Sequence, residues 1–231
     1  AMAVDATFFS LWIGNNDILG YATSGGVGVD QAGNMDPSTY GGNDITDPMV
    51  FAGVYSQLLE GLTANGAKGV VANIPDVTTI PYFTTVPYNS VPMGEARAAM
   101  VNANFELYNN QVLPLMVANN IIDAEEAALR EFSFSAGQNP PIITDKDSTD
   151  LTAILISQGI DSETANLLGQ LRQANADDLL LLPSSSVLGT LADPSNPMSI
   201  MGVAVPLSDE LVLTKTEQGR VHAAMVSYNA T

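Results

Sequence analysis

The chain has 231 residues, 46% of them hydrophobic, which is enough for one large domain or for one domain with an elaborate insertion. Lys and Arg number 7 against 25 Asp and Glu, and the formal charge of -18 makes nucleic acid and acidic membranes poor partners. There is no cysteine, which excludes disulfides and thiolate metal sites, and no apolar run is long enough for a membrane span.

The first element is a dense run of β-forming residues, 7–13, followed by the polar tetrad 14–17. Apolar and aromatic residues at this density predict a strand that is buried on both faces. The tetrad then falls at the carboxyl end of the strand, which is the edge where open α/β sheets bind ligands. An Asn held at this edge can direct its side-chain N–H₂ at a developing negative charge.

A second strand and an intervening helix follow. Residues 18–46 are rich in Gly, Asn and Asp and predict a long irregular stretch, a kind of segment that is usually functional or mobile. Asp47 and Pro48 are typical of a helix start, and Gly66 of a helix end. Residues 69–74 predict a second buried strand, so the three elements form a βαβ unit with parallel strands.

The pattern is less regular beyond residue 76. Residues 78–92 combine prolines with aromatic residues and predict an ordered, non-helical excursion. A helix is expected from about Glu95, and Pro114 should kink or end it. Asp123 opens a capping box for a short helix that runs to about Arg130.

The last third of the chain contains weaker signals. Residues 132–135 alternate like a strand, and residues 142–144 could pair with them. Helices are expected at 150–157 and 162–174, and the apolar run 179–182 is either a strand or a helix. A capped final helix is expected from Thr214 onward.

Together these elements predict an α/β core made of residues 2–76 and 207–231, with a large, mostly helical insertion at 77–206. Only two parallel strands are predicted with clear patterns, which is too few for a self-sufficient open sheet. We therefore expect that further chain once preceded Ala1.

The tetrad Gly14-Asn15-Asn16-Asp17 resembles the Gly-x-Asn-Asp block of the SGNH (GDSL-type) hydrolases, which are esterases and lipases with a flavodoxin-like sheet. The surrounding sequence is similar to large secreted or lipoprotein GDSL-type proteins of Bacteroidetes-like bacteria, and the matching segments are 8–21, 62–77, 177–183 and 212–229. The resemblance implies a single three-layer flavodoxin-like domain over residues 1–231, a small-molecule or lipid ester as substrate, no cofactor or metal, and export to the periplasm, the outer membrane or the medium.

The resemblance also implies a mechanism. In the family a Ser attacks the ester carbonyl, an Asp-x-x-His pair activates that Ser, and the Ser N–H, a Gly N–H and the Asn of the block hold the oxyanion. Carried over, Asn16 is that side-chain donor, Gly14 permits the turn off the strand, and Asp17 supports the loop. One such donor is worth roughly 3–4 kcal/mol of the barrier.

The chain departs from the family in its catalytic blocks. No Gly-Asp-Ser follows any predicted strand, and the only histidine, His222, is not part of an Asp-x-x-His motif. The resemblance therefore places the nucleophile, the base and the Gly donor outside residues 1–231, and the chain alone is expected to be inactive. The alternative is a non-catalytic binding or scaffold module that keeps the fold without a triad. The insertion could be a lid or a docking surface under either hypothesis.

Other candidate sites have simpler explanations. Ser162 completes a Gly-x-Asp-Ser sequence, but this sequence more naturally caps the next helix. His222 is expected on a helix surface. The acidic clusters at 30–47 and 145–150 do not fit a twelve-residue calcium loop, so turn chemistry explains them. Residues 81–88 could line an acyl pocket or form a packed loop, and the sequence leaves these alternatives open.

Overall fold

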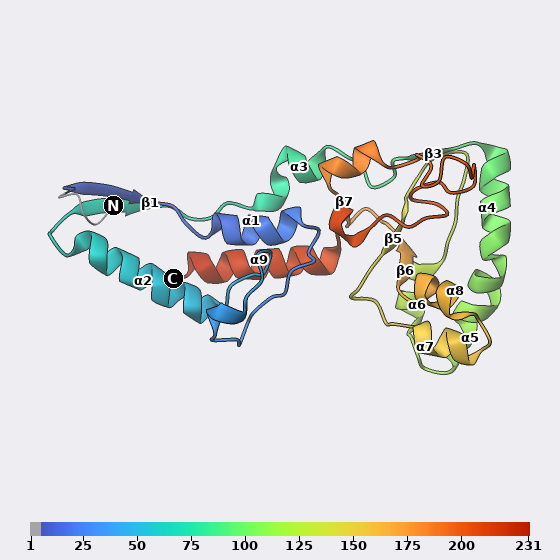
Figure 1. The fold of residues 1–231 in the computed structure, drawn as a ribbon, viewed down its shortest axis with the longest axis horizontal. Helices are drawn as coiled ribbons and strands as arrows, with labels where there is room; N and C mark the ends of the chain where they lie inside the picture. The colour runs from blue at the N-terminus through green and yellow to red at the C-terminus, as the bar shows by residue number, and fades with distance from the viewer. Residues whose placement is uncertain (1–5) are drawn as a thin grey trace. The chain divides into compact units, whose positions relative to one another are not determined.

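The computed structural model describes residues 6–231. The chain divides into two compact units: unit 1 is Ala1–Pro81 with Lys215–Thr231, and unit 2 is Tyr82–Thr214. The sequence places the change from core to insertion at residues 76–77 and 206–207, close to these boundaries. Both units contain helices and small sheets, which confirms the mixed α/β class (Figure 1).

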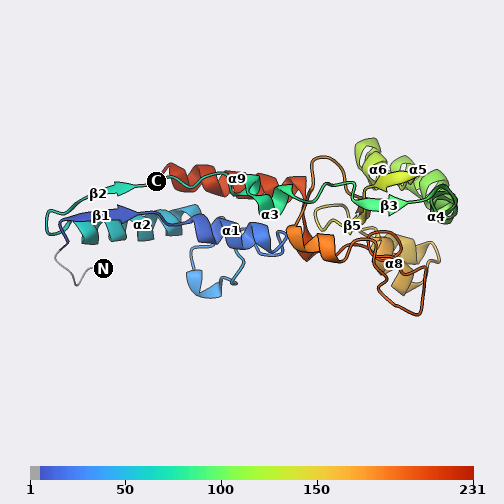
Figure 2. The same ribbon diagram turned by 90° about the horizontal axis from the view of Figure 1, so that it is seen from above.

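Unit 1 is built on two short parallel strands. Strand β1 (Phe8–Leu11) pairs with β2 (Lys68–Val71), so that Phe8 lies opposite Lys68 and Leu11 opposite Val71. The parallel pairing predicted for the βαβ unit is therefore confirmed. The helices of the unit are α1 (Asn15–Thr23), α2 (Pro48–Thr63) and α9 (Lys215–Asn229), and α9 packs beside both α1 and α2 (Figures 1 and 2).

The prediction that the first strand is buried on both faces is wrong. Phe8 is 61% exposed, Trp12 just beyond the strand is 59% exposed, and every residue of β2 is exposed. Parallel sheets are buried on both faces only where helices cover both. The described helices of unit 1 leave Phe8 and Val70 uncovered, although Phe9 lies so close over Gly69 that a Cβ there would sit 2.5 Å from its ring.

The segment between the two strands is more helical than its composition indicates. Helix α1 continues to Thr23, so the expected irregular stretch begins only after this helix. The remaining loop is held by Asp44, whose carboxylate accepts hydrogen bonds from the N–H groups of Val29 (2.9 Å) and Gly41 (2.7 Å). The predicted start of α2 is confirmed, because the Asp47 carboxylate accepts from the N–H groups at 49 and 50.

Unit 2 contains three two-stranded antiparallel sheets and five helices among its described elements, and α3 (Pro81–Thr84) leads into it from unit 1. The sheets pair β3 (Val91–Met93) with β4 (Gly137–Asn139), β5 (Ile142–Thr144) with β6 (Leu171–Gln173), and β7 (Leu179–Leu180) with β8 (Val212–Leu213). The helices are α4 (Glu95–Leu107), α5 (Leu113–Ala118), α6 (Ala124–Arg130), α7 (Thr152–Ser157) and α8 (Ser162–Leu168).

The strand expected at 132–135 does not form. Phe132 and Phe134 are both buried, as the alternation indicates, but their backbones bind side chains rather than a strand. The amide of Asn109 donates to the carbonyl of Phe132 (2.8 Å) and accepts from its N–H (3.1 Å). Asn102 makes the same pair with Phe134, at 2.9 Å in both directions. Two helical asparagines therefore take the place of a partner strand, and β5 pairs with β6 instead.

Two helix ends also differ from expectation. The helix predicted to reach residue 174 ends at Leu168, and the following residues become β6. Pro114 was expected to kink or end α4, and the second alternative is wrong, because the helix continues through a π-helical segment, Tyr108–Val112, into α5. A π turn suits this position, because Pro lacks an N–H and its ring crowds the preceding turn.

The core of unit 2 combines an apolar cluster with buried ion pairs. The cluster joins Phe132 with buried residues of α4, α7, β5 and β6, among them Val101, Ile142, Leu155 and Leu171. Buried Arg172 binds Asp145 (2.6 Å) and Asp178 (2.6 and 2.8 Å). A buried charge is tolerated only with such partners, so Asp145 of the second acidic cluster has a structural role.

Candidate functional site

The tetrad 14–17 lies where the chain leaves β1 and enters α1. Gly14 has φ +93°, a left-handed conformation that disfavours other residues. A Cβ at Gly14 would also lie 2.8 Å from Phe51 Cε2 and 2.9 Å from Ile74 Cδ1. The turn and the close packing both require glycine, so the backbone position of the next residues is tightly fixed.

Asn16 presents an unbonded donor to solvent. It is an exposed residue in the first turn of α1, and its Oδ1 accepts a hydrogen bond from Asn15 Nδ2 at 3.1 Å. Its own N–H₂ group has no acceptor among residues 6–231. The first N–H groups of a helix also lack intrahelical partners, so this turn carries several donors.

Asp17 attaches the tetrad to the loop before α2 and to α9. Its carboxylate accepts hydrogen bonds from both the N–H and the hydroxyl of Thr46, each at 3.0 Å, and from the hydroxyl of Tyr228. Burial raises the pKa of Tyr228, and the hydrogen bond to Asp17 raises it further, so this phenol stays protonated and remains a donor. The Tyr228 ring stacks on Phe51 with centroids 3.9 Å apart.

A hollow of about 190 Å³ lies at the carboxyl ends of the two strands. Its lining is mainly apolar and aromatic and includes Ile13, Phe51, Tyr55, Leu59, Val71 and Tyr228. Asn229 closes one side, since its amide accepts from the N–H of Ile74 (2.7 Å) and donates to the carbonyl of the same residue (3.0 Å). Phe51 links the hollow to the tetrad, because it also packs against Gly14.

The other two sequence candidates, Ser162 and His222, belong to different units. Ser162 is the first residue of α8 in unit 2, and Asp161 caps that helix by accepting from the N–H of Thr164. His222 is exposed on α9 in unit 1. Neither side chain has a hydrogen-bond partner in the part of the chain that the structure describes.

No group of three or more potential metal ligands occurs within residues 6–231. In the first acidic cluster, the carboxylate oxygens of Asp44 and Asp47 accept hydrogen bonds from backbone N–H groups, and Asp44 also accepts one from Gln31 Nε2 (2.6 Å). The hydrogen bond from Val29 lowers the pKa of Asp44, and the one from Gly33 (2.7 Å) lowers the pKa of Asp47. Over the same range, no helix combines the length and apolarity needed to cross a membrane.

The sequence does not indicate that Thr46, Phe51 and Tyr228 position the tetrad. Phe51 and Tyr228 stand out only as apolar-face positions on predicted helices, and nothing local ties them to the tetrad. Their contacts with residues 14–17 depend on the packing of α2 and α9.

Comparison with known proteins finds no family model, no curated protein and no solved structure that matches the chain. The fold and the site define the class only as a mixed α/β protein with an Asn donor after a parallel strand. Its function has to follow from the geometry of this donor.

Proposed function

We propose that unit 1 is part of an exported SGNH (GDSL-type) serine hydrolase that cleaves carboxylic or lipid esters through an acyl-enzyme, with Asn16 as a donor of the oxyanion hole. The observation that carries the proposal is the unbonded N–H₂ of Asn16 in the first turn after β1. The sequence resemblance of residues 8–21 to the family gives this donor its role.

The surroundings of Asn16 suit an oxyanion donor. A donor stabilises a transition state most when it is held in place before the reaction. Gly14 holds the turn by packing on Phe51, and Asp17 holds it through Thr46 and Tyr228. A fixed donor of this kind contributes about 3 kcal/mol to lowering the barrier.

The hollow beside the tetrad supports an ester substrate with an apolar part. Its lining from Phe51, Tyr55 and Leu59 offers no charged group to a ligand. Pockets that bind small molecules are typically apolar with a few polar groups that set orientation. An acyl or alkyl group in this hollow would lie near the tetrad through the shared contact with Phe51.

The exposed sheet supports a larger flavodoxin-like core. Phe8, Trp12 and Val70 expose apolar surface of a kind that α/β sheets cover with further strands and helices. Under the proposal these layers, with the nucleophilic Ser and its Asp-x-x-His base, come from protein outside residues 1–231. The chain alone then has the donor but not the nucleophile.

The test uses the product of the complete gene and a short-chain nitrophenyl ester. Asn16→Ala should lower kcat by about 10²–10³-fold with little change in KM, because the donor acts in the transition state. The matched control Asn65→Ala changes an exposed asparagine after α2 and should leave kcat unchanged. The 231-residue chain alone should show no hydrolysis. An unaffected kcat in Asn16→Ala would refute the role of this donor.

The second candidate is a non-catalytic binding or scaffold module. It is favoured by the absence of a paired nucleophile and base among residues 6–231, where His222 and Ser162 have no partners. A complete gene without Gly-Asp-Ser and Asp-x-x-His blocks, whose product fails to hydrolyse esters, would establish this candidate instead.

A further inference from the structure

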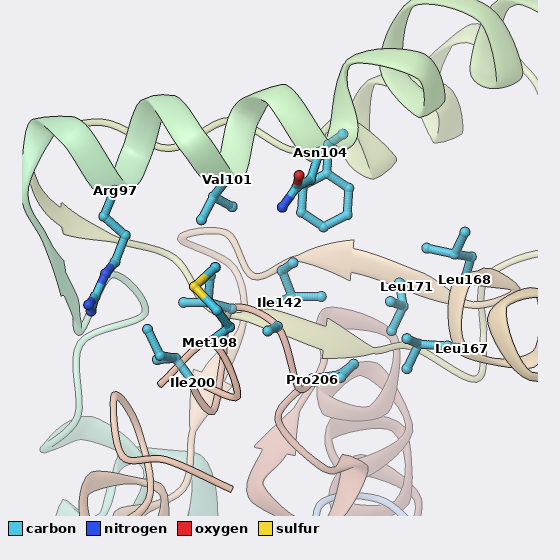
Figure 3. A pocket seen from close by; sticks show the side chains of 13 residues that line it. Arg97, Val101, Asn104, Ile142, Leu167, Leu168, Leu171, Met198, Ile200 and Pro206 are labelled. Carbon is cyan, nitrogen blue, oxygen red and sulfur yellow. The ribbon is translucent and has the colours of Figure 1, made fainter. Parts of the chain in front are cut away.

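Unit 2 contains a half-open apolar pocket that the proposed function does not use. Its volume is about 110 Å³, and α4, β5, β6, the end of α8 and the loop 198–206 line it (Figure 3). The floor is formed by buried side chains such as Val101, Ile142 and Leu171. The rim includes Leu167, which is 46% exposed, and Met198, which is 42% exposed.

Two polar side chains reach this pocket, and both come from α4. Arg97 and Asn104 lie on the same face of the helix as Val101, and Figure 3 shows both extending from α4 toward the apolar lining. They are separated by two helical turns, or roughly 10 Å along the axis. Asn104 has no hydrogen-bond partner in the described chain.

Most basic side chains of this protein have partners, but Arg97, like Lys68 of unit 1, has none among the described residues. The chain has 25 acidic residues for 7 basic ones, and Arg130, Lys146 and Arg172 all form ion pairs. Arg97 makes neither an ion pair nor a hydrogen bond with any residue that the structure describes. No carboxylate lines the pocket either. A guanidinium left open beside an apolar cavity is a ready receptor for an anionic group.

The wall opposite α4 is held in place. The N–H of Ile142 donates to the carbonyl of Gly202 at 2.8 Å, and the N–H of Leu207 donates to the carbonyl of Ile142 at 2.8 Å. Gly202 has φ +81°, and a Cβ there would lie 3.0 Å from Leu188 and from Pro141. The loop is therefore attached to Ile142 of β5 at two points, residues 202 and 207, so the pocket is formed without a ligand.

We infer that this pocket binds a short-chain monocarboxylate, with the carboxylate on the Arg97 guanidinium and the hydrocarbon chain on the floor between Val101 and Leu171. A cavity of about 150 Å³ lined by aliphatic residues accommodates benzene. The smaller volume here therefore suits a chain of about four to six carbons.

The charge of the molecule selects a carboxylate over a phosphate. One guanidinium neutralises one negative charge in a bidentate contact. A phosphate monoester brings nearly two charges to a protein whose formal charge is already -18, and the lining of the pocket offers no second cation. A neutral alcohol of the same length would leave the guanidinium unused.

The experiment is a titration of the 231-residue chain with sodium hexanoate at neutral pH and low salt, followed by the methyl NMR signals of Met198 and Ile200. Both signals should shift in a saturable manner. Arg97→Gln should weaken hexanoate binding by about tenfold, the effect of losing a charge-assisted contact. Ala204→Phe places a ring at an exposed position of the lining and should abolish the shifts.

Matched controls separate the pocket from general electrostatics. Lys68→Gln removes the same charge from unit 1 and should leave hexanoate affinity unchanged. 1-Hexanol should bind more weakly than hexanoate and should be insensitive to Arg97→Gln, and hexyl phosphate should also bind more weakly. Equal hexanoate affinity in the wild type and Arg97→Gln, or tighter binding of the alcohol or the phosphate, would overturn the inference. The substituted residue of each variant is exposed, so each variant should keep the wild-type fold. Circular dichroism checks this.

Discussion

The hydroxyl of Tyr228, on the last helix, donates a hydrogen bond to the carboxylate of Asp17 in the first turn of the first helix. The oxygen of the same hydroxyl lies 2.8 Å from the carbonyl oxygen of Thr46. A single phenol therefore connects α9, α1 and the loop before α2. The candidate site depends on the end of the chain as much as on the tetrad itself.

Tyr228→Phe should destabilise unit 1 by about 1–2 kcal/mol, because it removes one hydrogen bond to the charged carboxylate of Asp17. The two hydrogen bonds from Thr46 to the same carboxylate remain. The stacking on Phe51 is retained, so the loss reports the hydroxyl alone. The measurement is urea unfolding followed by the fluorescence of Trp12, the single tryptophan of the chain, which lies in unit 1.

The control for this variant is Tyr55→Phe. Tyr55 also lies next to Phe51, with ring centroids 5.8 Å apart, but its hydroxyl has no partner among the described residues. Its removal should change the free energy of unfolding by less than about 0.5 kcal/mol. Equal losses in the two variants would contradict a specific role for the bond between Tyr228 and Asp17.

Gly14→Ala should be more costly, since it combines two penalties. A non-glycine residue in the left-handed region costs roughly 1–2 kcal/mol. The new Cβ would in addition press on Phe51 and Ile74 at distances below 3.0 Å. Gly66→Ala is the matched control, because Gly66 has φ +78° and nothing within 4 Å of its Cβ position. The difference between the two losses of free energy of unfolding, measured in urea, is the energy of the clash. Equal losses would show that Phe51 and Ile74 move aside without a loss of stability.

Unit 1 should lose stability in acid. Hydrogen bonds from backbone N–H groups lower the pKa values of two carboxylates in the folded state. The main donor to Asp44 is the N–H of Val29, and the main donor to Asp47 is the N–H of Gly33. The stability from these carboxylates is present above the unfolded pKa of about 4 and is lost as the pH falls through the lower folded values. Urea midpoints from Trp12 fluorescence between about pH 6 and pH 3 should fall accordingly.

Asp47→Asn should flatten this acid dependence, because an amide cannot change its charge over the same range. Glu60→Gln is the control: Glu60 is an exposed carboxylate on α2 without a hydrogen-bond partner in residues 6–231. The control should follow the wild-type curve. A wild-type urea midpoint that rises as the pH falls toward 3 would contradict the stabilising role of these carboxylates.

Several local features could be read from the sequence. Asp47 and Asp123 were predicted as helix caps, and both carboxylates accept from the first N–H groups of their helices. The final helix after Thr214 and the parallel pairing of the first two strands were also predicted. That Asn16 acts as an oxyanion donor stays a prediction.

A local pattern does not predict the structure where it fits two possible partners. Phe132 and Phe134 alternate as a strand does, but the side chains of Asn109 and Asn102 satisfy their backbone groups. The first strand is apolar enough for burial on both faces, yet burial depends on which layers cover it. Neither outcome can be predicted from the residues of the segment itself.

The sequence by itself determined the caps, the glycine turn at residue 14 and the mixed α/β class, because each depends on interactions between residues a few positions apart. Only the tertiary structure decided that Tyr228 anchors Asp17 and that Arg97 stands open beside an apolar pocket. These arrangements join residues far apart in the chain, and their free energy comes from packing that no local pattern encodes.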